Sequence, residues 1–109
     1  AELYSSENRS KRITQYQAII DIAPQSLLAL NNLAWNYYKN GQINEALANA
    51  EQAYNLAADN RTILETYGVI LVAAGRYNDA IKILEEAITQ GSNDAEVKAS
   101  LVKAQTSLK

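Results

Sequence analysis

The feature that most constrains the fold of this chain is a residue pattern that repeats every 34 residues. Identical small, apolar and acidic residues recur at this interval, including Leu30/Leu64, Gly41/Gly75, Ala46/Ala80, Glu51/Glu85 and Ala53/Ala87. Three residue types that favour helix N-caps keep the same spacing, at Ser26, Asn60 and Asp94. Because one register holds these different residue types together, the sequence predicts stacked helix-turn-helix units.

Each unit is predicted to contain two antiparallel helices. In the first unit, residues 27–40 place apolar side chains three and four residues apart, which is typical of a helix with one buried face. Gly41 suits the left-handed backbone conformation that ends a helix, and the second helix is then expected to begin near Asn44. The second unit repeats the pattern, with a stop at Gly75 and a start near Asn78.

The predicted fold class is therefore all-α, an α-solenoid of antiparallel helix pairs with about six helices. Residues 27–60 and 61–94 form the two full units. Residues 1–26 are expected to hold an N-terminal segment and the second helix of a partial unit. Residues 95–109 are expected to form a following or capping helix.

The composition argues against an enzyme. The chain has neither His nor Cys, so it lacks the commonest general base, a thiol nucleophile and the commonest transition-metal ligands. The densest acids, Glu85 and Glu86, are adjacent in a predicted helix and point about 100° apart, so they cannot act on one bond together. The glycines are too dispersed for a phosphate-binding loop. We predict no catalytic residues, no cofactor and no metal.

Charge and hydropathy limit the classes of partner that this chain is expected to bind. The formal net charge of −2 has no clustered basic face, which disfavours nucleic acid as a partner. No apolar run approaches the roughly 18 residues that a membrane span requires, so direct membrane insertion is not expected. The lack of cysteine fits the cytoplasm of a bacterium and its periplasm or cell envelope alike. The chain begins with Ala and contains no Met, so a piece of a longer protein is expected.

The pattern resembles tandem tetratricopeptide (TPR) repeats. Two sets of residues carry this resemblance: Leu30-Asn31-Asn32-Leu33-Ala34-Trp35-Asn36-Tyr37-Tyr38 with Gly41, Ala46 and Ala53, and then Leu64, Tyr67, Gly68, Gly75, Tyr77, Ala80 and Ala87. Pro24 stands where the family commonly has its end-of-repeat proline, whereas Ala58 and Ser92 replace the later prolines. The resemblance implies a right-handed superhelix. A weaker resemblance, in residues 30–35 and 59–68, is to TPR segments of bacterial exopolysaccharide-associated proteins.

The resemblance also implies a function, because TPR arrays bind partners on a concave face lined by the first helix of each unit. The positions that match this face are Leu28, Asn31, Trp35, Tyr38, Thr62, Glu65, Val69 and Val72, with Glu96, Ala99 and Lys103 in the final helix. The expected function is a non-catalytic scaffold that binds a partner protein or peptide in this groove, as part of a longer array.

Trp35 and Tyr38 are the expected anchors. They lie three residues apart and therefore share one face of the helix. Beside Val69 and Val72 they are expected to hold an apolar segment, with Asn31 donating a hydrogen bond to its backbone. An alternative is that Trp35 only covers the helix of the next unit and has no ligand.

Two further expectations concern alternative partners. Some TPR domains bind the C-terminal carboxylate of chaperones through cationic side chains, but the matching positions here are Asn31, Trp35, Thr66, Glu96 and Ser100, which provide no cation. The alternative function is a structural or self-association module without a peptide ligand, in exopolysaccharide biosynthesis or export. A homodimer through exposed terminal helices, which would use Ile13, Tyr16 and Ile20, belongs to this alternative.

Overall fold

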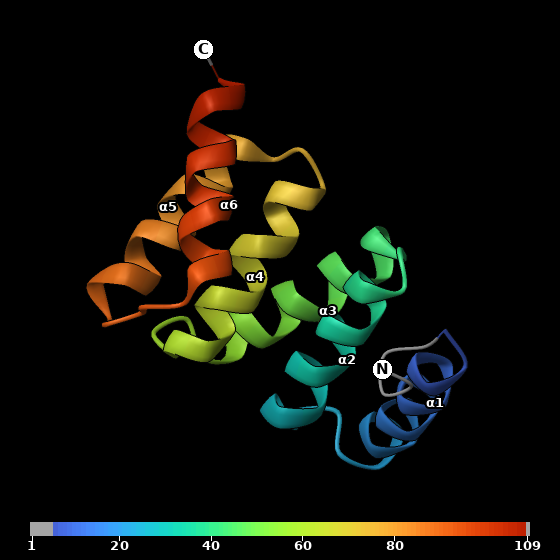
Figure 1. The fold of residues 1–109 in the computed structure, drawn as a ribbon. Coiled ribbons are helices and arrows are strands. Elements are labelled where there is room, and N and C mark those ends of the chain that lie inside the picture. Colours follow the sequence, from blue (N-terminus) through green and yellow to red (C-terminus); the bar gives the residue numbers. More distant parts are fainter. Residues whose placement is uncertain (1–5, 109) are drawn as a thin grey trace.

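The computed structural model describes residues 6–108, and within them it contains six helices and no strand (Figure 1). The helices are α1 (Ser6–Ile22), α2 (Leu27–Lys39), α3 (Ile43–Leu56), α4 (Arg61–Ala73), α5 (Tyr77–Thr89) and α6 (Ala95–Ser107). The predicted all-α solenoid of about six helices is confirmed. Each predicted 34-residue unit contains one antiparallel pair, α2 with α3 and α4 with α5. The segment predicted before α1 lies outside the described residues in part, at positions 1–5.

The helices stack in two rows. The first helices of successive units, α2, α4 and α6, contact one another in sequence, while α3 and α5 each pack against the helices that precede and follow them. At the N-terminal end, α1 packs on α2, as expected for the second helix of an earlier unit. Figure 1 shows α1 and α6 at opposite ends of the stack, whose extents are 40 × 29 × 23 Å. This arrangement places the side chains of α2, α4 and α6 along one common surface.

The three predicted N-caps are confirmed. The Ser26 hydroxyl accepts a hydrogen bond from the Ala29 amide at 3.3 Å, and the Asn60 side chain accepts one from the Ile63 amide at 3.2 Å. Asp94 accepts two, from the amides of residues 96 and 97 at 2.8 and 3.2 Å. Each cap therefore satisfies amides that the first turn of a helix leaves unpaired.

Replacing Asn60 by alanine is expected to lower the free energy of unfolding by about 1 kcal/mol, because the Ile63 amide loses its side-chain acceptor. Urea denaturation followed by circular dichroism measures this loss. Asn44→Ala is the matched control, since Asn44 is exposed within the first turn of α3 and does not cap it. Equal losses in the two variants would contradict the assigned role of the cap.

The second helices begin within one residue of the predicted starts, near Asn44 and Asn78, but these asparagines are not the N-caps. α3 begins at Ile43 and α5 at Tyr77, so Asn44 and Asn78 lie inside the first turn and do not cap it. The reason is the tightness of the preceding turns. Gly41 has a φ of 79°, and the amide of the next residue already bonds the Tyr37 carbonyl at 2.9 Å, so the chain re-enters a helix at once.

Small residues allow the helices of each pair to approach closely. Ala34, Ala46 and Ala80 have no exposed surface. Gly68 on α4 faces Leu84 of α5, where an added Cβ would lie 2.7 Å from the Leu84 Cγ and still closer to its Cδ2. Leu84 is itself completely buried. A larger side chain at Gly68 would therefore push α4 and α5 apart.

Candidate functional site

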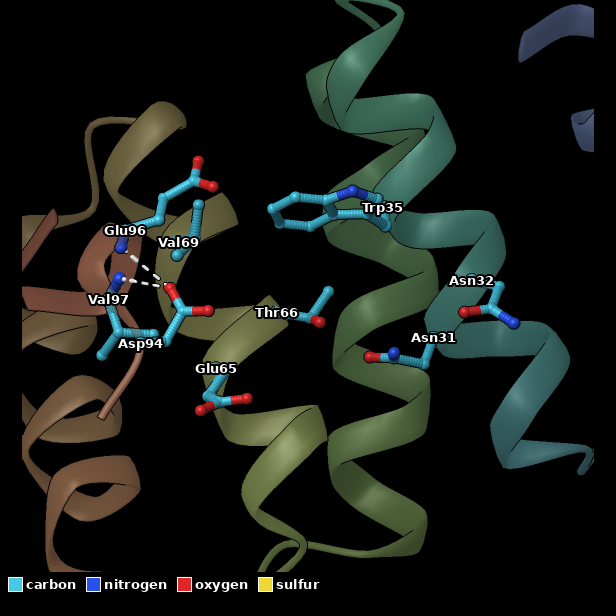
Figure 2. A pocket seen from close by; sticks show the side chains of 9 residues that line it. All are labelled: Asn31, Asn32, Trp35, Glu65, Thr66, Val69, Asp94, Glu96 and Val97. Carbon is cyan, nitrogen blue, oxygen red and sulfur yellow. Dashed lines mark hydrogen bonds between the residues drawn. The ribbon is translucent and has the colours of Figure 1, made fainter. Parts of the chain in front are cut away.

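A hollow of about 250 Å³ lies where α2, α4 and the start of α6 meet. Figure 2 shows its walls: the Trp35 ring extends from α2 across the opening toward Val69 of α4, and Glu96 lies on the far side. The nine lining residues are Asn31, Asn32, Trp35, Glu65, Thr66, Val69, Asp94, Glu96 and Val97. They come from three successive units, so the hollow exists only because the repeats stack.

Two further hollows adjoin the first and share residues with it. One, of about 270 Å³, is lined by Leu27, Leu28, Asn31, Asn60, Thr62 and Ile63. The other, of about 260 Å³, is lined by Tyr38, Val69, Val72, Ala73, Glu96, Ala99, Ser100 and Lys103. We call the three hollows together the inner groove. All eleven residues that the sequence placed on the concave face line it, including Glu96, Ala99 and Lys103 of the final helix.

These residues differ in how far their side chains are exposed. Val69 and Val72 are only 3% and 5% exposed, so they form the floor of the groove and do not project from it. Leu28, which is 73% exposed, lies at the rim. Helix α4 is the central helix of its row and is covered on most of its surface, which explains the burial of its valines.

The aromatic pair lies on one helix face, as its spacing predicts. The ring centroids of Trp35 and Tyr38 are 5.2 Å apart, and the ammonium of Lys39 lies 4.8 Å from the Trp35 ring and 5.3 Å from the Tyr38 ring. Both aromatic side chains are half-buried and pack against the core. Trp35 thus contributes to packing, and it also presents ring surface to the hollow.

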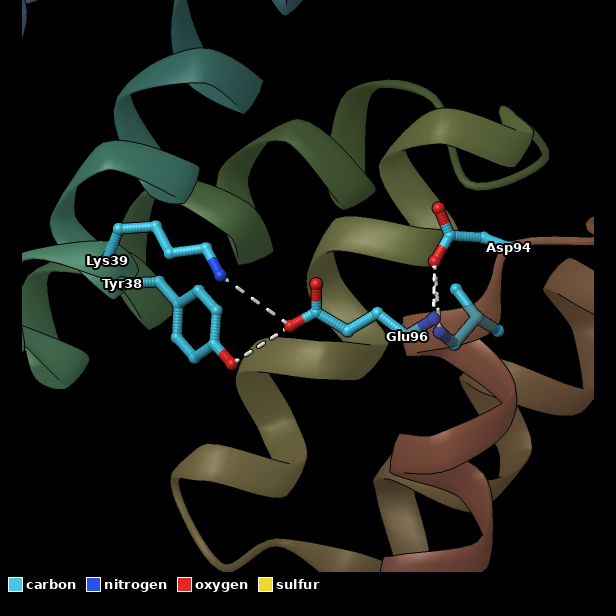
Figure 3. Close-up of polar contacts among 5 residues, drawn as sticks. Tyr38, Lys39, Asp94 and Glu96 are labelled. Atoms are coloured by element: carbon cyan, nitrogen blue, oxygen red, sulfur yellow. Dashed lines mark hydrogen bonds and ion pairs between the residues drawn. The ribbon is translucent and has the colours of Figure 1, made fainter. Parts of the chain in front are cut away.

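A polar network joins α2 to α6 across the groove (Figure 3). The Tyr38 hydroxyl donates to Glu96 Oε2 at 3.3 Å, and the Lys39 ammonium lies 3.9 Å from the same oxygen. Elsewhere in the wall of the hollow, the Ser92 hydroxyl donates to Glu65 Oε2 at 2.5 Å. Sequence reasoning placed Glu65 and Glu96 on the groove but missed Asp94 as a wall residue, because its cap role accounted for it fully.

Burial raises the pKa of the Tyr38 phenol, and the charge of Glu96 and its hydrogen bond to the phenol raise it further. Above a pH of about 10 the unfolded chain therefore releases this proton before the folded chain does. Folding stability is expected to fall as the pH rises through that range. Tyr67 has a raised pKa for the same primary reason, burial, followed by the charge of Glu51, and contributes in the same direction.

Titrating tyrosinate absorbance tests this assignment. Glu96→Gln is expected to move part of the titration to lower pH, because the variant removes the carboxylate that opposes ionisation of Tyr38. Glu86→Gln, an exposed position on α5, is expected to leave the curve unchanged. A curve that does not respond to Glu96→Gln would mean that this carboxylate does not control the phenol.

Residues 6–108 contain neither a metal-binding cluster nor a membrane-spanning helix. No group of three or more acidic side chains there is arranged to hold a metal ion. Within the same residues, no helix is long and apolar enough to cross a membrane.

Comparison with known proteins identifies the family of this chain. A family model described as "Tetratricopeptide repeat" matches residues 37–105, which is more than half of its length. The chain belongs to the tetratricopeptide repeat family. Its stacked helix pairs are then the TPR fold that the sequence resemblance implied. No curated protein matches the chain.

Solved TPR structures share the fold across nearly the whole chain. The Sgt2 TPR domain from Aspergillus fumigatus matches with a TM-score of 0.83 and 24% identity, over 94% of this chain and 69% of that one. The first TPR of Spaghetti (RPAP3), bound to the HSP90 peptide SRMEEVD, matches with a TM-score of 0.85 and 19% identity, over 98% and 85%. The second TPR domain of human RPAP3, in complex with the HSP70 peptide SGPTIEEVD, matches with 0.80 and 19%, over 95% and 87%.

Proposed function

We propose that this chain is a non-catalytic protein-interaction module that binds a peptide segment of a partner protein in its inner groove, as part of a longer TPR array. The observation that carries the proposal is the row of three adjoining hollows along α2, α4 and α6. A row of shallow hollows suits an extended chain, whose successive side chains would occupy successive hollows.

The groove has the chemical parts that such binding uses. Trp35 and Tyr38 supply rigid aromatic surface, which is the type of residue that contributes most to binding at interfaces. Asn31 lines two of the hollows and carries both a donor and an acceptor for a peptide backbone. The buried valines Val69 and Val72 provide an apolar floor.

The partner is expected to differ from those of the two peptide-bound neighbours. Those peptides are rich in glutamate and end in aspartate. The positions of this chain that match a carboxylate clamp are polar, aromatic or acidic (Asn31, Trp35, Thr66, Glu96 and Ser100), and none is cationic. An anionic chain end would find no Lys or Arg among them to neutralise it.

Selection of peptides from a random display library against the chain tests the proposal. Binding of the selected peptides is then measured by calorimetry with the wild type and with Asn31→Ala. The variant is expected to bind about three- to tenfold more weakly, as for the loss of one net hydrogen bond. Asn55→Ala, at an exposed position on α3, is the matched control and is expected to bind as the wild type does. Failure to select any peptide, or an equal loss with Asn55→Ala, would contradict the proposal.

Self-association is the second candidate, with exopolysaccharide biosynthesis or export as its setting. It is favoured by apolar side chains exposed at the two ends of the stack, where Ile22 is 87% and Val102 60% exposed. Ile13, Tyr16 and Ile20 on α1, which the sequence predicted to be partly uncovered, are half-buried. Light scattering over a range of concentrations tests this candidate, and a monomer at every concentration would reject it.

A further inference from the structure

We call the hollow of about 250 Å³ between α2, α4 and α6 the central hollow of the inner groove. Its lining is negatively charged. Three of its nine lining residues are carboxylates, Glu65, Asp94 and Glu96, and the described lining residues include no Lys or Arg. They come from α4, from the loop after α5 and from α6, and together they form the side of the hollow that faces Trp35 (Figure 2). An anionic guest would be repelled here, while a cationic one would be attracted.

Each of these carboxylates is held in place by one of its two oxygens. Glu65 Oε2 accepts from Ser92, Asp94 Oδ1 accepts from two backbone amides, and Glu96 Oε2 accepts from Tyr38. Among residues 6–108, no hydrogen bond or ion pair is found for the other oxygen of each. The three acids are therefore fixed by the fold and still have acceptor capacity for a donor that enters the hollow.

The aromatic wall of the hollow already accommodates an ammonium group. Lys39 Nζ lies within 5.3 Å of both the Trp35 and the Tyr38 ring and 3.9 Å from Glu96 Oε2 (Figure 3). This combination of aromatic faces and a carboxylate is the environment that stabilises a cation in partly desolvated sites. The Lys39 side chain is 41% exposed, so it lies at the edge of the opening and does not fill it.

From these observations we propose that the segment bound in the inner groove is basic, with a Lys or Arg side chain seated in the central hollow. The cation would lie against Trp35 and donate to the open oxygens of Glu65, Asp94 and Glu96. Apolar side chains of the same segment would occupy the neighbouring hollows over Val72 and Leu28. This inference rests on the proposed function, since it specifies the chemistry of the peptide that the groove binds.

The display-library peptides test the inference. They are expected to share a Lys or Arg at one position, and replacing that residue by norleucine is expected to weaken binding at least about tenfold. The variant Glu65→Gln/Glu96→Gln is expected to weaken binding by a similar factor. Its binding is also expected to be less sensitive to salt, because salt screens the attraction between the peptide cation and these two carboxylates, and the variant lacks both charges. Both substitutions keep the side-chain shape and an amide oxygen that can accept from Ser92 or Tyr38.

Glu85→Gln/Glu86→Gln is the matched control, because it removes the same charge from exposed positions on α5. It is expected to change binding less than about twofold. Circular dichroism of both double variants shows whether either has lost its fold. Peptides that bind the groove but are acidic or uncharged at every position would overturn the inference and leave the proposed function standing. If no peptide is selected, the proposed function fails first.

Discussion

Gly68→Leu is expected to lower the free energy of unfolding by about 3 kcal/mol or more, the largest stability change proposed for this chain. At Gly68 even a single added carbon would meet the buried Leu84 at contact distances that side chains do not adopt. The better helix propensity of leucine returns roughly 1 kcal/mol at most, which is too little to offset the overlap. Because domains of this size have only about 5–15 kcal/mol of stability, the urea midpoint is expected to fall sharply.

Ala48→Leu is the control for this substitution, since Ala48 is exposed on α3 and the same side chain enters solvent there. It is expected to change stability by less than about 0.5 kcal/mol. Adding Leu84→Ala to Gly68→Leu makes room for the new side chain, so the double variant is expected to lose less than the sum of the two single losses. Additive losses, or a Gly68→Leu variant as stable as the wild type, would show that the helices do not approach as described.

Trp35→Ala is expected to weaken binding of a groove peptide by about thirtyfold or more, which corresponds to roughly 2 kcal/mol. The indole forms one wall of the central hollow, and its ring centroid lies 5.2 Å from that of Tyr38, so its removal opens the wall and takes away a packing partner of Tyr38. Fluorescence anisotropy of a labelled library peptide measures the loss. The wild type offers a second readout, because Trp35 is the only tryptophan in the chain and its emission reports directly on the hollow.

A matched variant separates the effect of Trp35→Ala on packing from its effect on peptide binding. Tyr77 is another half-buried aromatic residue that packs on the same core, but it lies on α5, outside the lining of the inner groove. Tyr77→Ala is expected to lower the melting temperature and to leave peptide affinity nearly unchanged. If both variants bind equally well at a temperature where both are folded, Trp35 serves packing only.

Most of the fold was predictable because it depends on local chemistry that repeats. Gly41 and Gly75 end helices through a backbone conformation that glycine adopts without strain, and Ser26, Asn60 and Asp94 cap the helices that follow. The starts of α3 and α5 were predictable to within one residue, but Asn44 and Asn78 do not cap them, because a tight glycine turn returns the chain to a helix without a side-chain cap.

The sequence predicted which residues line the groove, but not how deeply each is buried or which hydrogen bonds it forms. The spacing of Trp35 and Tyr38 fixes their common face, but the burial of Val69 and Val72 depends on the neighbouring rows of helices. The polar network was out of reach of sequence reasoning. The hydrogen bonds from Ser92 to Glu65 and from Tyr38 to Glu96 join residues 27 and 58 positions apart, and no short-range pattern indicates such pairs.

Amide chemical shifts, recorded while a library peptide is added to the chain, test the central claim most directly, because they locate the bound segment without any substitution. The account predicts that the largest shifts map to α2, α4 and the start of α6, and that the Trp35 indole N–H shifts with them. The largest shifts on α3 and α5, with the indole signal unmoved, would place the partner on the opposite surface and contradict the account.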